Sequence, residues 1–190
     1  MARVEYVLPL GDNVRKRHSH ETVRGTVISF VVQLEVFVDE QWRPVLRYDS
    51  MHGFSHIDWY RRSGESRKEL LPLSFAEALT LADEDIQERR EEYQDRFSKR
   101  RVAMNVHEKQ QAVLVTEFDR YVIEHPEFAA QIPSGAQVVI QVEGDEAFNV
   151  WATELAQRQR EQWQAVVYVH VKGLKPVHSR LEEPVIQEIA

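Results

Sequence analysis

Six side chains that could act in catalysis or bind a ligand fall within the twelve residues from Arg47 to Asp58. They are Arg47, Tyr48, Asp49, His52, His56 and Asp58. The stretch follows a strand-like run of residues and contains a glycine between the two histidines. If the protein has a chemical site, we expect it here.

Three interpretations of this stretch remain open. In the first, the two imidazoles and Asp49 or Asp58 hold zinc or another divalent ion, because nitrogen and carboxylate oxygen are suitable ligands for such ions. In the second, the site cleaves RNA without a metal. In the third, the residues are structural: the arginine pairs with an aspartate, and the histidines satisfy backbone groups at a strand end.

The second interpretation needs a general base, a general acid and a cation near the charge that develops on the phosphate. His52 and His56 could be the base and the acid near neutral pH, and Arg47 could be the cation. Tyr48 could orient the phosphate, and Asp58 or Asp49 could fix a histidine tautomer. The predicted catalytic set is therefore His52, His56, Arg47, Tyr48 and Asp58, with no cofactor.

Two basic segments lie outside this stretch and are interpreted as solvated charged faces or as contacts for RNA or an acidic partner. They comprise Arg15, Lys16, Arg17, His18, His20 and Arg24, and then Arg96, Lys99, Arg100 and Arg101. On a strand His18 and His20 would share one face and could join a metal site if the fold brought them near His52, but solvated loop histidines are much commoner.

The first half of the chain reads as an α+β domain. Strand-like runs cover residues 4–10, 26–38, 42–48 and 54–60, which predicts an antiparallel meander of about four strands. Pro44 cannot donate to a ladder, so its strand must be bulged or lie at an edge. A capping box of Ser74 and Glu77 opens a helix predicted over residues 75–98, whose polar face, including Asp83, is expected to be solvated.

The second half reads as a small α/β domain. A helix is expected to end before His125-Pro126, and strand 137–142, a helix and strand 165–171 then favour a parallel crossover. The predicted organisation is a domain over residues 1–100, a linker over 101–108, an acidic domain over 109–174 and an extended tail over 175–190.

Composition places the chain among globular proteins. It has 190 residues, 43% of them hydrophobic, and no cysteine, which excludes disulfides and thiolate metal sites. The net charge of -7 is uneven, with 17 basic and 18 acidic residues in 1–103 (-1) against 7 and 13 in 104–190 (-6). This charge disfavours a general nucleic-acid binder. Without an apolar span or a secretory signal, a cytoplasmic location is expected.

Two resemblances follow from the motifs. The Arg47-Tyr48-Asp49 segment, His52-Gly53 and His56 with Asp58 resemble a group of small uncharacterised prokaryotic proteins and, more loosely, the toxins of TumE-type toxin–antitoxin pairs. Residues 109–182 are similar to a second small prokaryotic family of unknown function. The residues that carry this similarity are Glu117 to Tyr121, His125 to Glu127, Phe148 to Trp151, Leu155-Ala156, Val167 to Val169 and Ser179 to Leu181.

These resemblances imply a fused toxin–antitoxin pair. The first module would be ribonuclease-like and would act on RNA, and the acidic second module would be a neutralising or partner module. The alternative is a non-enzymatic interaction or regulatory protein, in which the second domain and tail bind a protein partner or a second copy of the chain.

Overall fold

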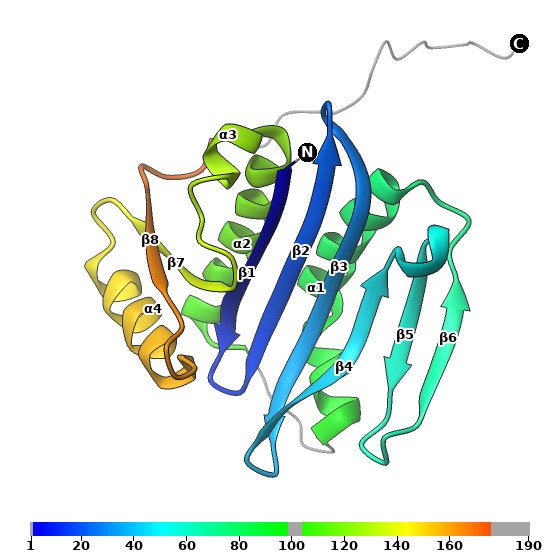
Figure 1. Cartoon of the computed structure of the whole chain (residues 1–190). Coiled ribbons are helices and arrows are strands. Elements are labelled where there is room, and N and C mark those ends of the chain that lie inside the picture. Colours follow the sequence, from blue (N-terminus) through cyan, green and yellow to red (C-terminus); the bar gives the residue numbers. More distant parts are fainter. Residues whose placement is uncertain (1, 99–103, 176–190) are drawn as a thin grey trace, which may run out of the picture.

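One mixed sheet of eight strands runs through residues 2–98 and 104–175, which are the residues described by the computed structural model (Figure 1). The strand order is β6-β5-β4-β3-β2-β1-β7-β8. The strands are β1 (Ala2–Gly11), β2 (Val14–Val23), β3 (Thr26–Val38), β4 (Gln41–Asp49), β5 (His56–Tyr60), β6 (Ser66–Leu70), β7 (Ala136–Val142) and β8 (Val166–Val171). The helices are the short 3-10 turn η1 (Met51–Gly53), α1 (Phe75–Ser98), α2 (Val106–Glu124), α3 (Pro126–Ala129) and α4 (Glu146–Gln159).

The first six strands form an antiparallel meander, as β-branched and aromatic residues joined by tight turns predict. The predicted hairpin between β3 and β4 is confirmed, and it turns at Asp39 and Glu40, both with positive φ. The register of β3 against β4 shifts between Leu34 and Glu35, and Glu35 pairs with Pro44. The proline is therefore accommodated by a bulge, one of the two predicted solutions.

The second part of the chain adds β7 and β8 in parallel, with α4 as the crossover helix, as predicted. Two helices of this part, α2 and α4, begin with a side chain that caps the helix N-terminus. Asn105 and Glu108 form a reciprocal capping box at α2, and the Asp145 side chain accepts from the backbone N–H of Phe148 at α4. The mixed α+β fold class predicted from the sequence is thus observed.

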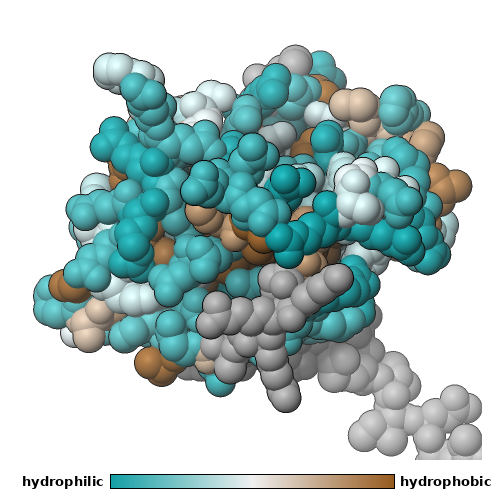
Figure 2. Space-filling model, turned by 90° about the horizontal axis from the view of Figure 1, so that it is seen from below, coloured by the Kyte–Doolittle hydropathy of each residue, from teal (hydrophilic) through white to brown (hydrophobic). Residues whose placement is uncertain are grey.

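Helices α1 and α2 cover one face of the sheet, and α4 lies on the other (Figure 1). Tyr6 of β1 reaches α2, whereas Gln137, opposite the neighbouring Val7, donates to a backbone oxygen of α4. The main core lies between the sheet and α1 with α2, and it includes Leu8, Leu34, Leu79 and Val122. The end with the β1–β2 turn is largely hydrophilic, with hydrophobic residues in separate spots (Figure 2). None of the helices within the described ranges is long and apolar enough to span a membrane.

Two details differ from the sequence predictions, and a third prediction falls largely on residues outside the described part of the chain. The meander has six strands instead of about four, because the basic segment forms β2 and residues 66–70 form β6. Helix α2 begins at Val106, inside the predicted linker over 101–108. Of the predicted tail over 175–190, residues 176–190 lie outside the described part of the chain.

The capping box of α2 yields a stability prediction. Asn105→Ala removes the acceptor for the Glu108 backbone N–H and should lower the free energy of unfolding by about 1 kcal/mol. Urea denaturation measures the loss. Asn105→Asp keeps an acceptor at this position and serves as the matched control. Equal stability of Asn105→Ala and the wild type would contradict a structural role for this cap.

Candidate functional site

Strand pairing brings together four of the charged or ligating residues predicted from the sequence. Arg47 pairs with Asp58, and Asp49 pairs with His56, across β4 and β5. Side chains alternate along a strand, and Tyr48 between Arg47 and Asp49 contacts α1. The other four side chains therefore point away from the helix-covered face, to the open face of the sheet.

Ion pairs and hydrogen bonds connect this open-face cluster, which we define as Arg47, Asp49, His56, Asp58 and Lys68. Arg47 Nη2 lies 2.5 Å from an Asp49 oxygen. The Lys68 ammonium lies 2.8 Å from His56 Nε2 and 3.7 Å from an Asp58 oxygen. Because an ammonium only donates, Nε2 of His56 accepts, and Nδ1 carries the proton that it shares with the Phe54 carbonyl at 3.3 Å.

His52 stands beside the open-face cluster on the 3-10 turn between β4 and β5. Its side chain is exposed, and its ring centre lies 6.4 Å from that of His56 at an interplanar angle of 29°. Its backbone has a φ of 74°, a left-handed conformation that is uncommon for a residue with a side chain. The turn thus holds a solvent-accessible imidazole next to a buried one.

Tyr48 does not join this group. Its hydroxyl donates to Asp85 Oδ2 of α1 at 2.8 Å, and Tyr93 donates to the same carboxylate. Burial, together with the bond to Asp85, raises the pKa of Tyr48 well above its ordinary value. The tyrosine predicted to orient a phosphate therefore lies on the opposite side of the sheet from Arg47 and His56.

Lys68 is the member of the cluster that the sequence reasoning missed. It lies on β6 opposite Asp58, and its side chain is 44% exposed. A hairpin after Tyr60 places Lys68 beside Asp58. The charged residues from Arg67 to Glu69 are typical of a polar turn, so the sequence did not predict a strand at this position. The Lys68 ammonium is the group that holds the His56 tautomer.

A second cluster of polar residues is buried between the sheet and the helices. Lys16 and His18 on β2, Tyr6 on β1, Asp83 on α1 and Asp119 on α2 are each 3% exposed or less. The Lys16 ammonium lies 3.0 Å from Asp83 Oδ1 and in short contact with Asp119 Oδ2. Tyr6 donates to Asp119 Oδ1 at 2.7 Å. We call these five residues the buried junction cluster.

Burial and mutual charge shift the pKa values in the buried junction cluster. Burial alone would lower the pKa of Lys16, but the charges of Asp119 and Asp83 outweigh it and raise that pKa. Burial, with the charge of Asp119, raises the pKa of Asp83 to about 7 despite the opposing charge of Lys16. Burial, followed by the effects of His20 and Lys16, lowers the pKa of His18 well below 6.5. The Lys16 ammonium is therefore the shared counter-charge of the Asp83 and Asp119 carboxyl groups.

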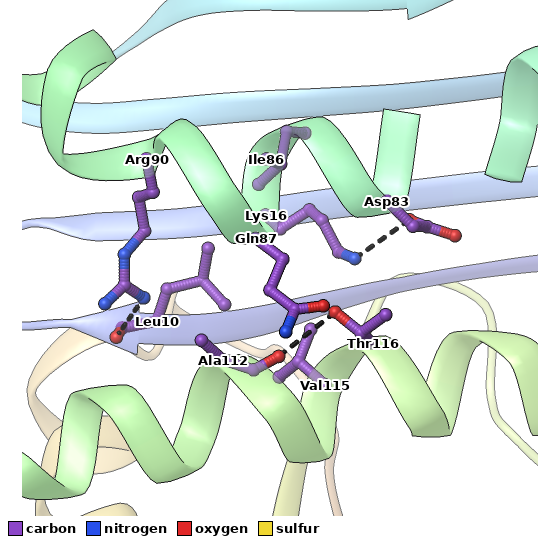
Figure 3. Close-up of a pocket in the computed structure, with 9 residues that line it drawn as sticks. All are labelled: Leu10, Lys16, Asp83, Ile86, Gln87, Arg90, Ala112, Val115 and Thr116. Atoms are coloured by element: carbon purple, nitrogen blue, oxygen red, sulfur yellow. Dashed lines mark hydrogen bonds and ion pairs between the residues drawn. The ribbon is translucent and has the colours of Figure 1, made fainter. Parts of the chain in front are cut away.

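A small cavity adjoins this cluster, and Figure 3 shows its lining with Lys16 directed towards Asp83. Its volume is about 10 Å³, which is about the space of one water molecule. Arg90 closes the far end and donates to the Leu10 carbonyl at 2.7 Å. The remaining lining is largely apolar.

The interpretation of the first basic segment as a solvated face is wrong for Arg15, which is 2% exposed, and for the side chains on the helix side of β2. Lys16, His18 and His20 are almost fully buried, and His18 Nε2 lies 2.9 Å from His20 Nδ1. The expectation that Asp83 would be solvated is wrong as well. The one local signal was the spacing of two between Lys16, His18 and His20, which places them on one strand face.

The fold and these clusters describe a two-part protein with a shared mixed sheet. Residues 1–103 match a family described as a domain of unknown function (DUF7718), and the chain belongs to this family. Residues 105–184 match a second family of unknown function (DUF5647). Comparisons with curated proteins and with solved structures give no match. The contact between Lys16 and Asp119 thus crosses from one family segment to the other.

The pKa of Asp83 yields a prediction on pH and stability. A carboxyl whose pKa is raised in the folded state contributes stability at acidic pH and loses it as the pH rises from about 4 to about 7. Asp83→Asn removes this titration. Between about pH 5 and pH 8, the free energy of unfolding of the wild type should therefore fall by about 1 kcal/mol or more relative to Asp83→Asn.

Urea denaturation at several pH values, in the presence of a chelator, measures this difference. Glu88→Gln changes an exposed carboxyl of the same helix and is the matched control, which should follow the wild type. If the wild type and Asp83→Asn showed parallel pH dependence, Asp83 would not titrate differently in the folded and unfolded states.

Proposed function

We propose that the protein is of toxin–antitoxin type, with a ribonuclease-like first module and a second module that acts as its partner. The observation that carries the proposal is the open-face cluster, in which Arg47, His56 and Asp58 meet Lys68 beside the exposed His52. The sequence resemblance to TumE-type toxins supports the same class.

The spacing of the two imidazoles suits acid and base catalysis on one phosphate. Two groups that each lie within a hydrogen bond, about 3 Å, of one phosphate group are themselves about 6 Å apart. The ring centres of His52 and His56 are 6.4 Å apart. In this mechanism the base takes the proton of the RNA 2′-hydroxyl, whose oxygen then bonds to phosphorus. The acid protonates the departing 5′-oxygen, and the products are a 2′,3′-cyclic phosphate and a 5′-hydroxyl.

The cations of the cluster have separate roles in this proposal. Arg47 is 28% exposed and Lys68 is 44% exposed, so both can reach a phosphate on the open face. They would stabilise the negative charge that develops on the phosphate oxygens. His56 is 1% exposed, so its Nε2 atom would meet the phosphate only when Lys68 turns away from it. Asp58 lies 3.7 Å from the Lys68 ammonium and would hold that ammonium beside the ring. Tyr48 has no role, because it faces α1.

The arrangement of the sheet favours a second module that acts as a partner of the first module and does not cover the open-face cluster. Strand β7 pairs with β1, and β1, β2 and β3 separate it from β4 in the sheet order. The second module instead contributes Asp119 to the buried junction cluster and Glu161 to Arg15 and Arg17 of β2. We therefore expect it to stabilise the first module while leaving the open-face cluster accessible.

The proposal predicts metal-independent RNA cleavage by the full chain. In the presence of a chelator, His52→Ala should lower the cleavage rate about 10²-fold or more, because one proton-transfer group is lost. The full chain is used because Lys16 and Tyr6 would lose their buried partner Asp119 in the first module alone. Cleavage of labelled RNA, with mapping of the product ends, is the measurement.

Two variants sharpen the test. His170→Ala changes an exposed histidine of β8, and Tyr48→Phe changes a hydroxyl on the helix side, so both should retain cleavage. Absence of cleavage by the wild type, or equal cleavage by His52→Ala, would rule out the catalytic assignment.

The second candidate function is a non-enzymatic interaction protein, and the exposed edge of β8 favours it. Within the described residues β8 pairs on one side only, and its sequence VVYVHV contains no lysine, arginine or acid. The opposite edge, β6, carries three charged residues in the sequence SRKEL. Charged edges resist pairing with another chain, and apolar edges promote it. A second copy of the chain can therefore extend the sheet by antiparallel pairing at β8.

This candidate predicts a concentration-dependent dimer. Tyr168→Lys places a charge on the exposed edge, where it would meet its own copy, and should raise the dimer dissociation constant at least tenfold. Val113→Lys changes an exposed apolar residue of α2 and is the matched control. Analytical ultracentrifugation of the full chain measures the association. A wild type that remains a monomer at all concentrations would exclude pairing at β8.

A further inference from the structure

Three side chains of the buried region form a compact group of ligand atoms from both family segments. His18, Asp83 and Asp119 each offer one nitrogen or oxygen atom, and these atoms all lie within 4.8 Å of one another. The three residues come from β2, α1 and α2 and are 0%, 3% and 0% exposed. An imidazole and two carboxylates that converge in this way are a ligand set for a divalent transition-metal ion.

His18 provides an independent indication of a ligand. Its Nδ1 atom is fully buried and has no hydrogen-bond partner among the described residues. The same atom faces the carboxylates, at 3.9 Å from Asp83 Oδ1 and 3.7 Å from Asp119 Oδ1. Buried polar atoms are rarely left without a partner. A cation bound between the three side chains would satisfy this nitrogen.

The surroundings also match the outer shell of a metal site. The other ring nitrogen of His18 lies 2.9 Å from His20 Nδ1, and the Tyr6 hydroxyl donates to Asp119 Oδ1. Tyr6 stacks on the His18 ring at 4.9 Å and 5°. Hydrogen bonds of this kind fix the orientation and tautomer of the ligands in metalloproteins.

We infer that His18, Asp83 and Asp119 bind a divalent metal ion of the Zn²⁺ class, and that the Lys16 ammonium is the alternative cation at the same place. The ammonium now contacts both carboxylates, at 3.0 Å from Asp83 and at a shorter distance from Asp119. An imidazole nitrogen among the ligands favours Zn²⁺, Fe²⁺ or Ni²⁺ over Mg²⁺ or Ca²⁺.

A small cavity adjoins the Lys16 side chain. This cavity of about 10 Å³ is lined by Lys16, Asp83 and Thr116 among others (Figure 3). Because two ligands belong to the first family segment and Asp119 to the second, the ion would hold the two modules together. Metal binding and the docking of α2 are therefore coupled.

Calorimetric titration of the chelator-treated full chain with Zn²⁺ tests this inference. We expect one equivalent to bind and, at about 100 times the dissociation constant, the Tm to rise by about 5–10 °C. Co²⁺ should bind competitively and show the absorption bands of a low-symmetry site with nitrogen and oxygen ligands. Lys16→Met removes the competing ammonium and should tighten Zn²⁺ binding at least tenfold.

Matched variants separate this site from surface histidines. His18→Gln should abolish the binding and the Tm increase, whereas His170→Gln on the exposed edge should keep both. Melting in chelator shows whether His18→Gln is folded, and the Co²⁺ spectrum of the wild type remains a test if it is not. Absence of Zn²⁺ binding, binding by Lys16→Met alone, or equal binding by folded His18→Gln would overturn the inference.

Discussion

The contact of Lys16 with Asp119 and Asp83 is the interaction on which the rest of the structure depends. All three charged groups lie out of water, with side chains at most 3% exposed. Such charges are tolerated only when they meet one another with good geometry. The register of β2, the rotation of α1 and the position of α2 are thereby linked, because a shift of any one element would leave a buried charge without its partner.

This constraint separates two regions of the sheet. The β1–β2 end joins the two family segments through strand pairing, Asp119 and the bridge from Glu161 to Arg15 and Arg17. The β4–β6 end carries the open-face cluster and the exposed His52. Strand β3 lies between them and contacts α1. The chemistry proposed for the first module is therefore separated in space from the surface that binds the second module.

Local sequence patterns predicted the elements better than they predicted the sites. The box of Ser74 and Glu77 and the helical spacing that follows it predicted α1, and the apolar runs predicted the β3–β4 hairpin and the β7–α4–β8 crossover. Side chains alternate between the two faces of a strand, which places Tyr48 on the opposite face of the sheet from Arg47 and Asp49. This signal was present in the sequence of β4 but was not used in the prediction. The partners of Lys16 lie 67 and 103 residues away, so local patterns could not show that it is buried.

A double-mutant cycle between Lys16 and Asp119 tests the account most directly. Lys16→Met, Asp119→Asn and the double variant are compared with the wild type by urea denaturation in the presence of a chelator. Lys16→Met should lower the free energy of unfolding by about 3 kcal/mol or more, because it leaves two buried carboxylates without their cation. Asp119→Asn should lower it by less, because Lys16 keeps its contact with Asp83 at 3.0 Å. The double variant should lose at least about 1 kcal/mol less than the sum. Losses that add to within about 0.5 kcal/mol would show that this contact does not hold the two modules together.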